Sequence, residues 1–236
     1  MKKKILLTVS IALFFAVISA CIYVFAFYLP QKRAKDEQME LVYEYYQNKL
    51  IKYQEENEKY DDYEIDVAFL GDSLTDGCDV EHYYPDYKVV NRGIGGETTH
   101  GLQKRMDVSL YDLKPKVAVI LIGGNNLDTM FENYEDMLRD IREKLPNTQV
   151  ILCSLTAMGG NWAEKNRIAT YNNVIIEKLA EKYGCCFVDL YSPLFDLETG
   201  EICSDYTVEG VHLTPLGYEI ITGVINPVIE TVISDK

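Results

Sequence analysis

The sequence lacks the residue spacings that hold a zinc ion. Its six cysteines form no C-x-x-C pair, and its three histidines, His82, His100 and His212, form no cluster with them at metal-ligand spacing. Zinc sites in proteins are built from such closely spaced cysteine and histidine ligands. The sequence therefore predicts no metal centre.

Positive charge is scarce after the first 35 residues. Residues 1–35 hold six of the 23 basic residues and no acidic residue, so residues 36–236 carry 17 basic against 37 acidic residues, a formal charge of −20. A surface of that sign repels polyanions. We therefore expect no nucleic-acid partner for this part of the chain and little affinity for anionic lipid head groups.

Internal repeats and low-complexity tracts are also absent, and the 236 residues suit one α/β domain with an appended segment. The odd number of cysteines after residue 35, five, argues against a fully paired disulfide framework. Cys153, Cys185 and Cys186 lie in or beside apolar runs and are expected to pack as small hydrophobic residues. A bridge between Cys78 and Cys203 stays open for an exported domain.

One long hydrophobic run stands out at the start of the chain. It extends over 25 uncharged apolar residues from Ile5 to Leu29, directly after the basic stretch Met1–Lys4. As a helix it would reach about 37 Å, enough to cross a hydrocarbon core of roughly 30 Å. We predict a single-pass signal anchor at residues 5–29, with residues 1–4 in the cytoplasm and the following domain extracytoplasmic at the cell membrane.

A rival interpretation uses Cys21. The stretch ISAC, which ends at Cys21, resembles a bacterial lipoprotein signal box, in which the cysteine becomes the lipidated first residue. The chain stays apolar from Ile22 to Leu29, which favours an uncleaved anchor. Both interpretations hold the protein to the membrane through its N-terminal segment.

The next segment, residues 30–62, is polar and rich in helix-forming residues. Apolar and tyrosine side chains recur in it at three- and four-residue spacing, which predicts one amphipathic helix between Lys35 and Tyr60. This helix is either a stalk or docks on the following domain through its tyrosine stripe. The recurring residues are Leu41, Val42, Tyr45, Tyr46, Leu50 and Tyr53.

From residue 63 to residue 236, short apolar runs alternate with helical patterns. This order is typical of an α/β fold in which a parallel sheet lies between helices. The predicted strands are Val67–Leu70, Tyr87–Asn91, Val117–Ile122, Val150–Ser154 and Cys186–Asp189, and the predicted helices are Thr98–Leu113, Tyr134–Leu145, Ala163–Tyr183 and Pro215–Ile233.

Residues with hydrolase chemistry follow these strands. Ser73 comes directly after the first strand, at the carboxyl edge where open parallel sheets bind their ligands. Taken alone, Gly-Asp-Ser is equally well a turn and a helix N-cap. The later strands add a glycine N–H at Gly93 and a side-chain amide at Asn125, and His212 precedes the last helix as a candidate general base.

Four sequence blocks carry a family resemblance. The blocks GDSL (71–74), NRGIGG (91–96), GGNN (123–126) and EGVHL (209–213) resemble the signature blocks of the SGNH hydrolases, or GDSL esterases and lipases, in the same order. The resemblance implies a flavodoxin-like three-layer α/β/α sandwich with a parallel sheet, and a serine esterase that needs no metal or other cofactor. It implies Ser73 as nucleophile, His212 as base, and Ser73 N–H, Gly93 and Asn125 as oxyanion donors.

The sequence departs from the family pattern at two positions. Asn126 stands where the family usually has aspartate, and Glu209 stands where it usually has the aspartate that orients the histidine. Glutamate can take that role in related triads. If Glu209 points away, His212 is left to a backbone carbonyl or to Asp205.

Other polar residues have weaker claims to a role. The loop that ends at Trp162 either walls the substrate pocket or packs as ordinary structure, Asp72 is expected to fix the turn before Ser73, and Glu97 and Asp76 are expected to be solvated.

Taken with the resemblance, the sequence predicts an exported, membrane-tethered esterase. Its expected partner is a small acyl ester, such as O-acetyl on a glycan, or a lysophospholipid or simple lipid ester. The chain offers no extended apolar lid, which disfavours long-chain lipids. An O-acyltransferase acting on a cell-surface glycan and a catalytically weak binding module remain the alternatives.

Overall fold

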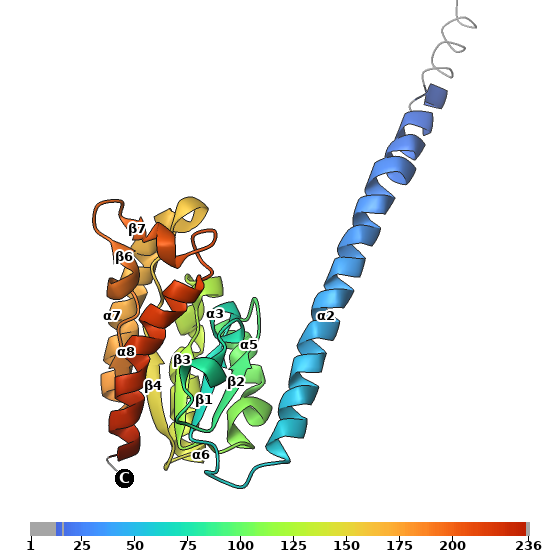
Figure 1. Ribbon diagram of the computed structural model, residues 1–236. Coiled ribbons are helices and arrows are strands. Elements are labelled where there is room, and N and C mark those ends of the chain that lie inside the picture. The colour runs from blue at the N-terminus through green and yellow to red at the C-terminus, as the bar shows by residue number, and fades with distance from the viewer. Residues whose placement is uncertain (1–12, 16, 235–236) are drawn as a thin grey trace, which may run out of the picture. The chain divides into compact units, whose positions relative to one another are not determined.

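The computed structural model describes residues 13–15 and 17–234, and this part of the chain divides into two units between Lys49 and Leu50. Helix α2, Leu29–Asn57, spans this boundary, so its last residues, 50–57, belong to the second unit (Figure 1). The helix begins and ends slightly before the predicted Lys35–Tyr60. The role of segment 30–62 as a stalk remains a prediction.

The N-terminal unit is helical wherever it is described. A π-helical turn, Val24–Tyr28, precedes α2, and the helical stretch Leu13–Asn57 is long and apolar enough to cross a membrane. Its large apolar side chains, among them Phe14, Phe15 and Phe25, are exposed. Residues 5–12 and 16 of the predicted anchor lie outside the described residues, so the anchor itself remains a prediction.

The second unit is built on a five-stranded parallel sheet with the strand order β2-β1-β3-β4-β5. This is the flavodoxin-like order. The prediction of an α/β fold with a parallel sheet is confirmed, and each predicted strand is present with ends shifted by one or two residues. The strands are β1 Val67–Gly71, β2 Val89–Gly93, β3 Val117–Leu121, β4 Gln149–Cys153 and β5 Cys186–Val188.

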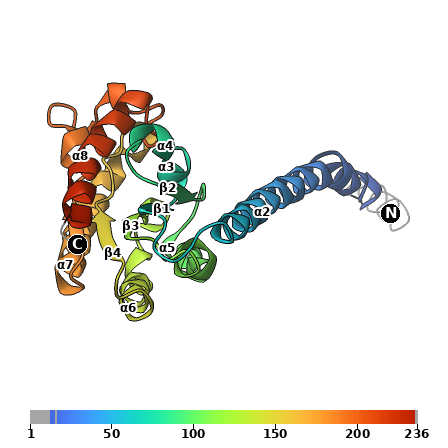
Figure 2. The same cartoon turned by 60° about the horizontal axis from the view of Figure 1, so that its bottom comes forward.

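Helices cover both faces of the sheet, which completes the three layers (Figure 2). Alternate residues of each strand point to opposite faces: in β1, Ala68 and Leu70 join the core under α5, α6 and α7, whereas Val67 and Phe69 join the core under α8. Continuous apolar strands are needed here because both faces are buried. The covering helices are α5 Thr99–Lys104, α6 Tyr134–Lys144, α7 Asn166–Lys182 and α8 Pro215–Ser234. Helix α8 is also long and apolar enough to span a membrane, but it packs on the sheet as a core helix.

Some local features differ from the sequence predictions. The helix predicted at Thr98–Leu113 is divided into α5 and a π-helical turn, Asp107–Tyr111, with Arg105 between them outside helical geometry at φ −109° and ψ 12°. Helix α7 is preceded by a 3-10 turn, Gly160–Lys165, and an unpredicted hairpin is formed by β6, Phe195–Asp196, and β7, Glu201–Ile202. The suggested Cys78–Cys203 bridge is wrong, since all six cysteines are free.

Candidate active site

A tight turn at the end of β1 presents Ser73. A side chain at Gly71 would lie 2.3 Å from the carbonyl oxygen of Leu121, so only glycine fits there. Asp72 caps the short helix α3, Ser73–Asp76, by accepting the N–H of Leu74 at 3.1 Å. The expectation that Asp72 fixes this turn agrees with the contact. The strand thus delivers the Ser73 hydroxyl at the carboxyl edge of the sheet.

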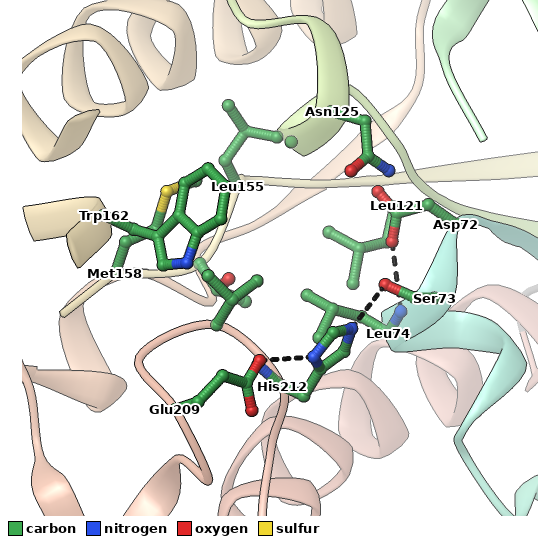
Figure 3. Close-up of a pocket in the computed structure, with 13 residues that line it drawn as sticks. Asp72, Ser73, Leu74, Leu121, Asn125, Leu155, Met158, Trp162, Glu209 and His212 are labelled. Carbon is green, nitrogen blue, oxygen red and sulfur yellow. Dashed lines mark hydrogen bonds and ion pairs between the residues drawn. The ribbon is translucent and has the colours of Figure 1, made fainter. Parts of the chain in front are cut away.

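His212 and Glu209 face Ser73 from the loop before α8 (Figure 3). His212 Nε2 lies 3.0 Å from Ser73 Oγ, and His212 Nδ1 contacts Glu209 Oε1. A carboxylate only accepts hydrogen bonds, so the proton belongs on Nδ1 and Nε2 is free to accept the Ser73 hydroxyl. Glu209 therefore points toward His212, and the contact of its carboxylate with Nδ1 takes the place considered for Asp205 or a backbone carbonyl.

The loop that carries Glu209 and His212 is fixed by its backbone. Gly210 has φ +97°, and a side chain there would lie 2.2 Å from the carbonyl oxygen of Gly159. Gly159 N–H donates to Gly210 O at 2.8 Å, and Thr207 Oγ1 donates to His212 O at 2.9 Å. The three-residue separation of Glu209 and His212 is thus held in one conformation.

Asn125 approaches Ser73 from the end of β3 (Figure 3). Its Nδ2 donates to the carbonyl oxygen of Glu97 at 2.8 Å, which leaves a second N–H on the same nitrogen. Asn126 beside it exchanges hydrogen bonds with Thr99, through Nδ2 to Oγ1 at 3.0 Å and from the Thr99 N–H at 3.2 Å. Neutral amide contacts thus brace the loop at the position where the family usually has aspartate.

A cavity of about 140 Å³ opens beside these residues. It is lined by Ser73, His212, Glu209 and Asn125 and has an apolar wall formed by Leu74, Leu121, Leu155, Met158, Trp162 and Val211. Trp162 is 41% exposed, and Lys165 Nζ lies 4.5 Å from the centre of its ring. Trp162 therefore belongs to the wall of this cavity, which was one of two roles considered from the sequence.

Asp72 also lines the cavity and is only 5% exposed. Its burial raises the pKa of the carboxyl to about 6, and the Leu74 N–H opposes this effect by favouring the ionised form. Within the described part of the chain, no group of three histidine, cysteine or acidic side chains is placed to hold a metal ion.

Comparison with known proteins decides the family. Residues 69–220, more than half of the chain, match the GDSL-like Lipase/Acylhydrolase family. The chain belongs to this family. As a GDSL esterase, it is a hydrolase of the SGNH type, and the predicted family, fold and enzyme class are confirmed.

Individual relatives agree with this assignment. Platelet-activating factor acetylhydrolase IB subunit alpha1 from Bos taurus is 28% identical over 169 residues, which cover 66% of this chain and 72% of that protein. A GDSL-like lipase from Bacteroides thetaiotaomicron VPI-5482 has 26% identity and a TM-score of 0.68, with 77% of this chain and 97% of that chain covered. Axe2, an acetyl xylan esterase from Geobacillus stearothermophilus, shares the fold at 22% identity and a TM-score of 0.59, with 71% and 95% covered.

The structure corrects the predicted role of Gly93 in this GDSL esterase. Its N–H donates to Asn91 Oδ1 at 2.8 Å, and its carbonyl oxygen accepts the Tyr53 hydroxyl at 2.6 Å, so its N–H is not available to a substrate. A side chain at Gly93 would lie 2.2 Å from the backbone nitrogen of Asp76. The glycine is required because β2 packs closely against α3.

The prediction that Glu97 is solvated is also wrong, because its carboxylate is buried. Glu97 is 8% exposed, and its Oε2 pairs with Nε of the buried Arg105 at 2.9 Å. Arg105 Nη2 donates to Gly71 O at 3.0 Å, two residues before Ser73. The sequence analysis did not single out Arg105, because a basic residue within the predicted helix Thr98–Leu113 gives no sign of burial.

Proposed function

We propose that Ser73 is the nucleophile of this esterase, with His212 as general base and Glu209 as the group that orients the imidazole. One observation carries the proposal: Ser73 Oγ, the His212 ring and the Glu209 carboxylate form a continuous hydrogen-bonded chain between segments 139 residues apart. This is the arrangement that activates a serine hydroxyl.

The proposed reaction has two acyl-transfer steps. Ser73 Oγ attacks the ester carbonyl carbon while His212 Nε2 takes the hydroxyl proton, and His212 then gives that proton to the departing alcohol. A water molecule, deprotonated by His212, next attacks the acyl-enzyme, and the proton returns to Ser73 as the acid leaves. The negative charge on the carbonyl oxygen needs hydrogen-bond donors in both steps.

The free N–H of the Asn125 amide and the backbone N–H of Ser73 are the proposed oxyanion donors. In place of Gly93, we assign a backbone donor to the turn Ile94–Glu97, which is closed by Glu97 N–H to Ile94 O at 3.2 Å and tied to Asn125 through Glu97 O. Gly96 in this turn has φ +76°, and its N–H makes no hydrogen bond to any described residue. This turn therefore offers the donor that Gly93 does not.

The proposed substrate is a short acyl ester, with O-acetyl on a glycan as the leading candidate. Leu74 and Leu121 also line a second, smaller apolar cavity next to the main one, so these two side chains limit the depth that is open to an acyl chain. The exposed Trp162 ring offers an apolar face for a sugar. The names of two relatives, a platelet-activating factor acetylhydrolase and an acetyl xylan esterase, support an acetyl group.

We also propose that the enzyme works outside the cytoplasm, tethered to the membrane by its N-terminal segment. The exposed apolar helix in the described part of that segment supports a tether. The tether is a single-pass anchor or, alternatively, a lipid on Cys21.

The test is a panel of p-nitrophenyl esters of rising acyl length, followed by acetylated xylo-oligosaccharide and an acetylated lysophospholipid. We expect hydrolysis that is fastest for acetate, is abolished by Ser73→Ala and is unchanged by Ser204→Ala, a control at an exposed serine. A Ser73→Ala protein that still hydrolyses these esters would refute the assignment. Acetyl transfer to an added glycan in preference to water would identify an O-acyltransferase instead.

A further inference from the structure

The last eight residues of α2, about two helical turns, pack as part of the catalytic unit. Tyr53, on this piece of helix, is 1% exposed, whereas most neighbouring side chains of α2 are exposed. The Tyr53 hydroxyl donates to Gly93 O at 2.6 Å. Gly93 is the last residue of β2 and directly precedes the turn Ile94–Glu97.

A buried arginine forms the second contact between this helix and β2. Arg92 is fully buried, its guanidinium lies 4.6 Å from the centre of the Tyr53 ring, and its Nη1 pairs with Glu56. Its Nη2 donates to Asn57 Oδ1 at 2.9 Å. A buried charge without partners is costly, so β2 is held in register with the helix end.

The contacts continue from β2 to the candidate active site. Arg105 Nη1 donates to Arg92 O at 2.9 Å, and the other two nitrogens of Arg105 reach Gly71 O and the Glu97 carboxylate. Glu97 O in turn accepts the Asn125 amide at 2.8 Å. The side chains and backbone of Arg92, Arg105 and Glu97 therefore connect the end of α2 by hydrogen bonds to Asn125, the residue proposed as an oxyanion donor.

We propose that Tyr53 and Glu56 are positioning residues that hold the oxyanion-binding side of the active site from the end of α2. The inference rests on the proposed function of Ser73 and Asn125. Both residues act on the segment Arg92–Gly93, which carries the turn Ile94–Glu97, and neither lines the cavity. Their expected effect is on the geometry of the transition state and not on substrate binding.

Tyr53→Phe in the full chain, in detergent micelles, tests the proposal, because it removes the hydroxyl and keeps the ring. With p-nitrophenyl acetate we expect kcat to fall about 10-fold and KM to change less than 2-fold, in a protein with an unchanged circular-dichroism spectrum. Tyr171→Phe, at an exposed tyrosine of α7, is the matched control and should leave both constants unchanged.

A double-mutant cycle separates positioning from a general structural effect. If Tyr53 acts through the Asn125 side of the site, Tyr53→Phe should cost less than about 2-fold in kcat when Asn125→Ala is already present. Glu56→Gln, which keeps the shape of the side chain, should lower kcat in the same direction and provides an independent variant.

Three results would overturn the proposal. Wild-type kcat in both Tyr53→Phe and Glu56→Gln would show that the helix end is only a tether, and a full 10-fold loss in the Asn125→Ala background would show that Tyr53 does not act through Asn125. In either case, Ser73-dependent hydrolysis by the unaltered protein would leave the proposed function intact. Failure of the unaltered protein to hydrolyse esters or to react with a fluorophosphonate at Ser73 would overturn both.

Discussion

Replacing Glu209 by glutamine tests the departure of this esterase from the family pattern. The substitution keeps the length of the side chain and removes its charge. The carboxylate allows only the tautomer with the proton on His212 Nδ1, whereas an amide can also donate to Nδ1 and so place the proton on Nε2, facing Ser73. Glu209→Gln therefore populates an imidazole that cannot accept the serine proton.

The expected loss of kcat depends on how far the His212 and Glu209 side chains are exposed to solvent. The side chains of His212 and Glu209 are 53% and 47% exposed. A carboxylate about 4 Å from the imidazolium formed during the reaction stabilises it by about 1 kcal/mol in bulk water and by about 4 kcal/mol near a protein surface. This half-exposed pair lies between these limits, so about 2–3 kcal/mol, or roughly 30- to 150-fold in kcat, is expected.

Steady-state hydrolysis of p-nitrophenyl acetate measures the effect, with Glu198→Gln, at an exposed glutamate of the β6–β7 turn, as the control. KM should change little, because Glu209 acts on the developing charge. A Glu209→Gln enzyme within 2-fold of the unaltered kcat would refute the reasoning, since His212 would then be oriented by another group.

Three further changes follow from the geometry of the site. Asn125→Ala should lower kcat about 10²- to 10³-fold in the same assay without unfolding the protein. A change below 3-fold would show that Asn125 is not an oxyanion donor. Because burial raises the pKa of Asp72 to about 6, its ionisation costs the folded state about 3 kcal/mol as the pH rises from about 4 to above 6. In urea unfolding, Asp72→Asn should therefore be more stable than the unaltered protein at pH 8, with a gain that shrinks toward pH 4; an equal gain at both would contradict the raised pKa. Leu121→Ala should join the main cavity to the neighbouring apolar cavity, and should raise kcat/KM for hexanoate relative to acetate about 10-fold. Leu155→Ala should not change this ratio, because Leu155 lines only the main cavity.

The sheet was predictable because its strands are buried on both faces. Runs such as Val117–Ile122 are too short and too uniformly apolar for an exposed element, and they alternate with helical patterns of ordinary length. The β6–β7 hairpin was not predictable, because its strands have two residues each and no apolar alternation. The break after α5 was not predictable either, because the local sequence around Arg105, residues 102–113, contains no glycine or proline that would interrupt a helix.

The sequence predicted those residues of the candidate site that lie just beyond the ends of strands or just before a helix. Ser73 and Asn125 lie two and four residues after the ends of β1 and β3, and His212 lies three residues before α8, so the common edge of a parallel sheet brings them together. Gly93 was wrongly assigned as an oxyanion donor. The sequence motif does not show that the Gly93 N–H already donates a hydrogen bond to the Asn91 side chain. Arg92 was missed and Glu97 was wrongly expected to be solvated, because long charged side chains are usually exposed and the burial of these two depends on partners elsewhere in the sequence.

The burial of Tyr53 sets a limit on where this chain can be cut without harm. A protease that cleaves before Leu50 would release a fragment that keeps both Tyr53 and Glu56, and with them the support under β2. A cut after Asn57 would remove Glu56 and Asn57, the two hydrogen-bond partners of the buried Arg92 guanidinium, and would expose this charge to solvent. If the chain is tethered to the membrane as we propose, a cut before Leu50 would release an active enzyme, whereas a cut after Asn57 would release one with lowered kcat.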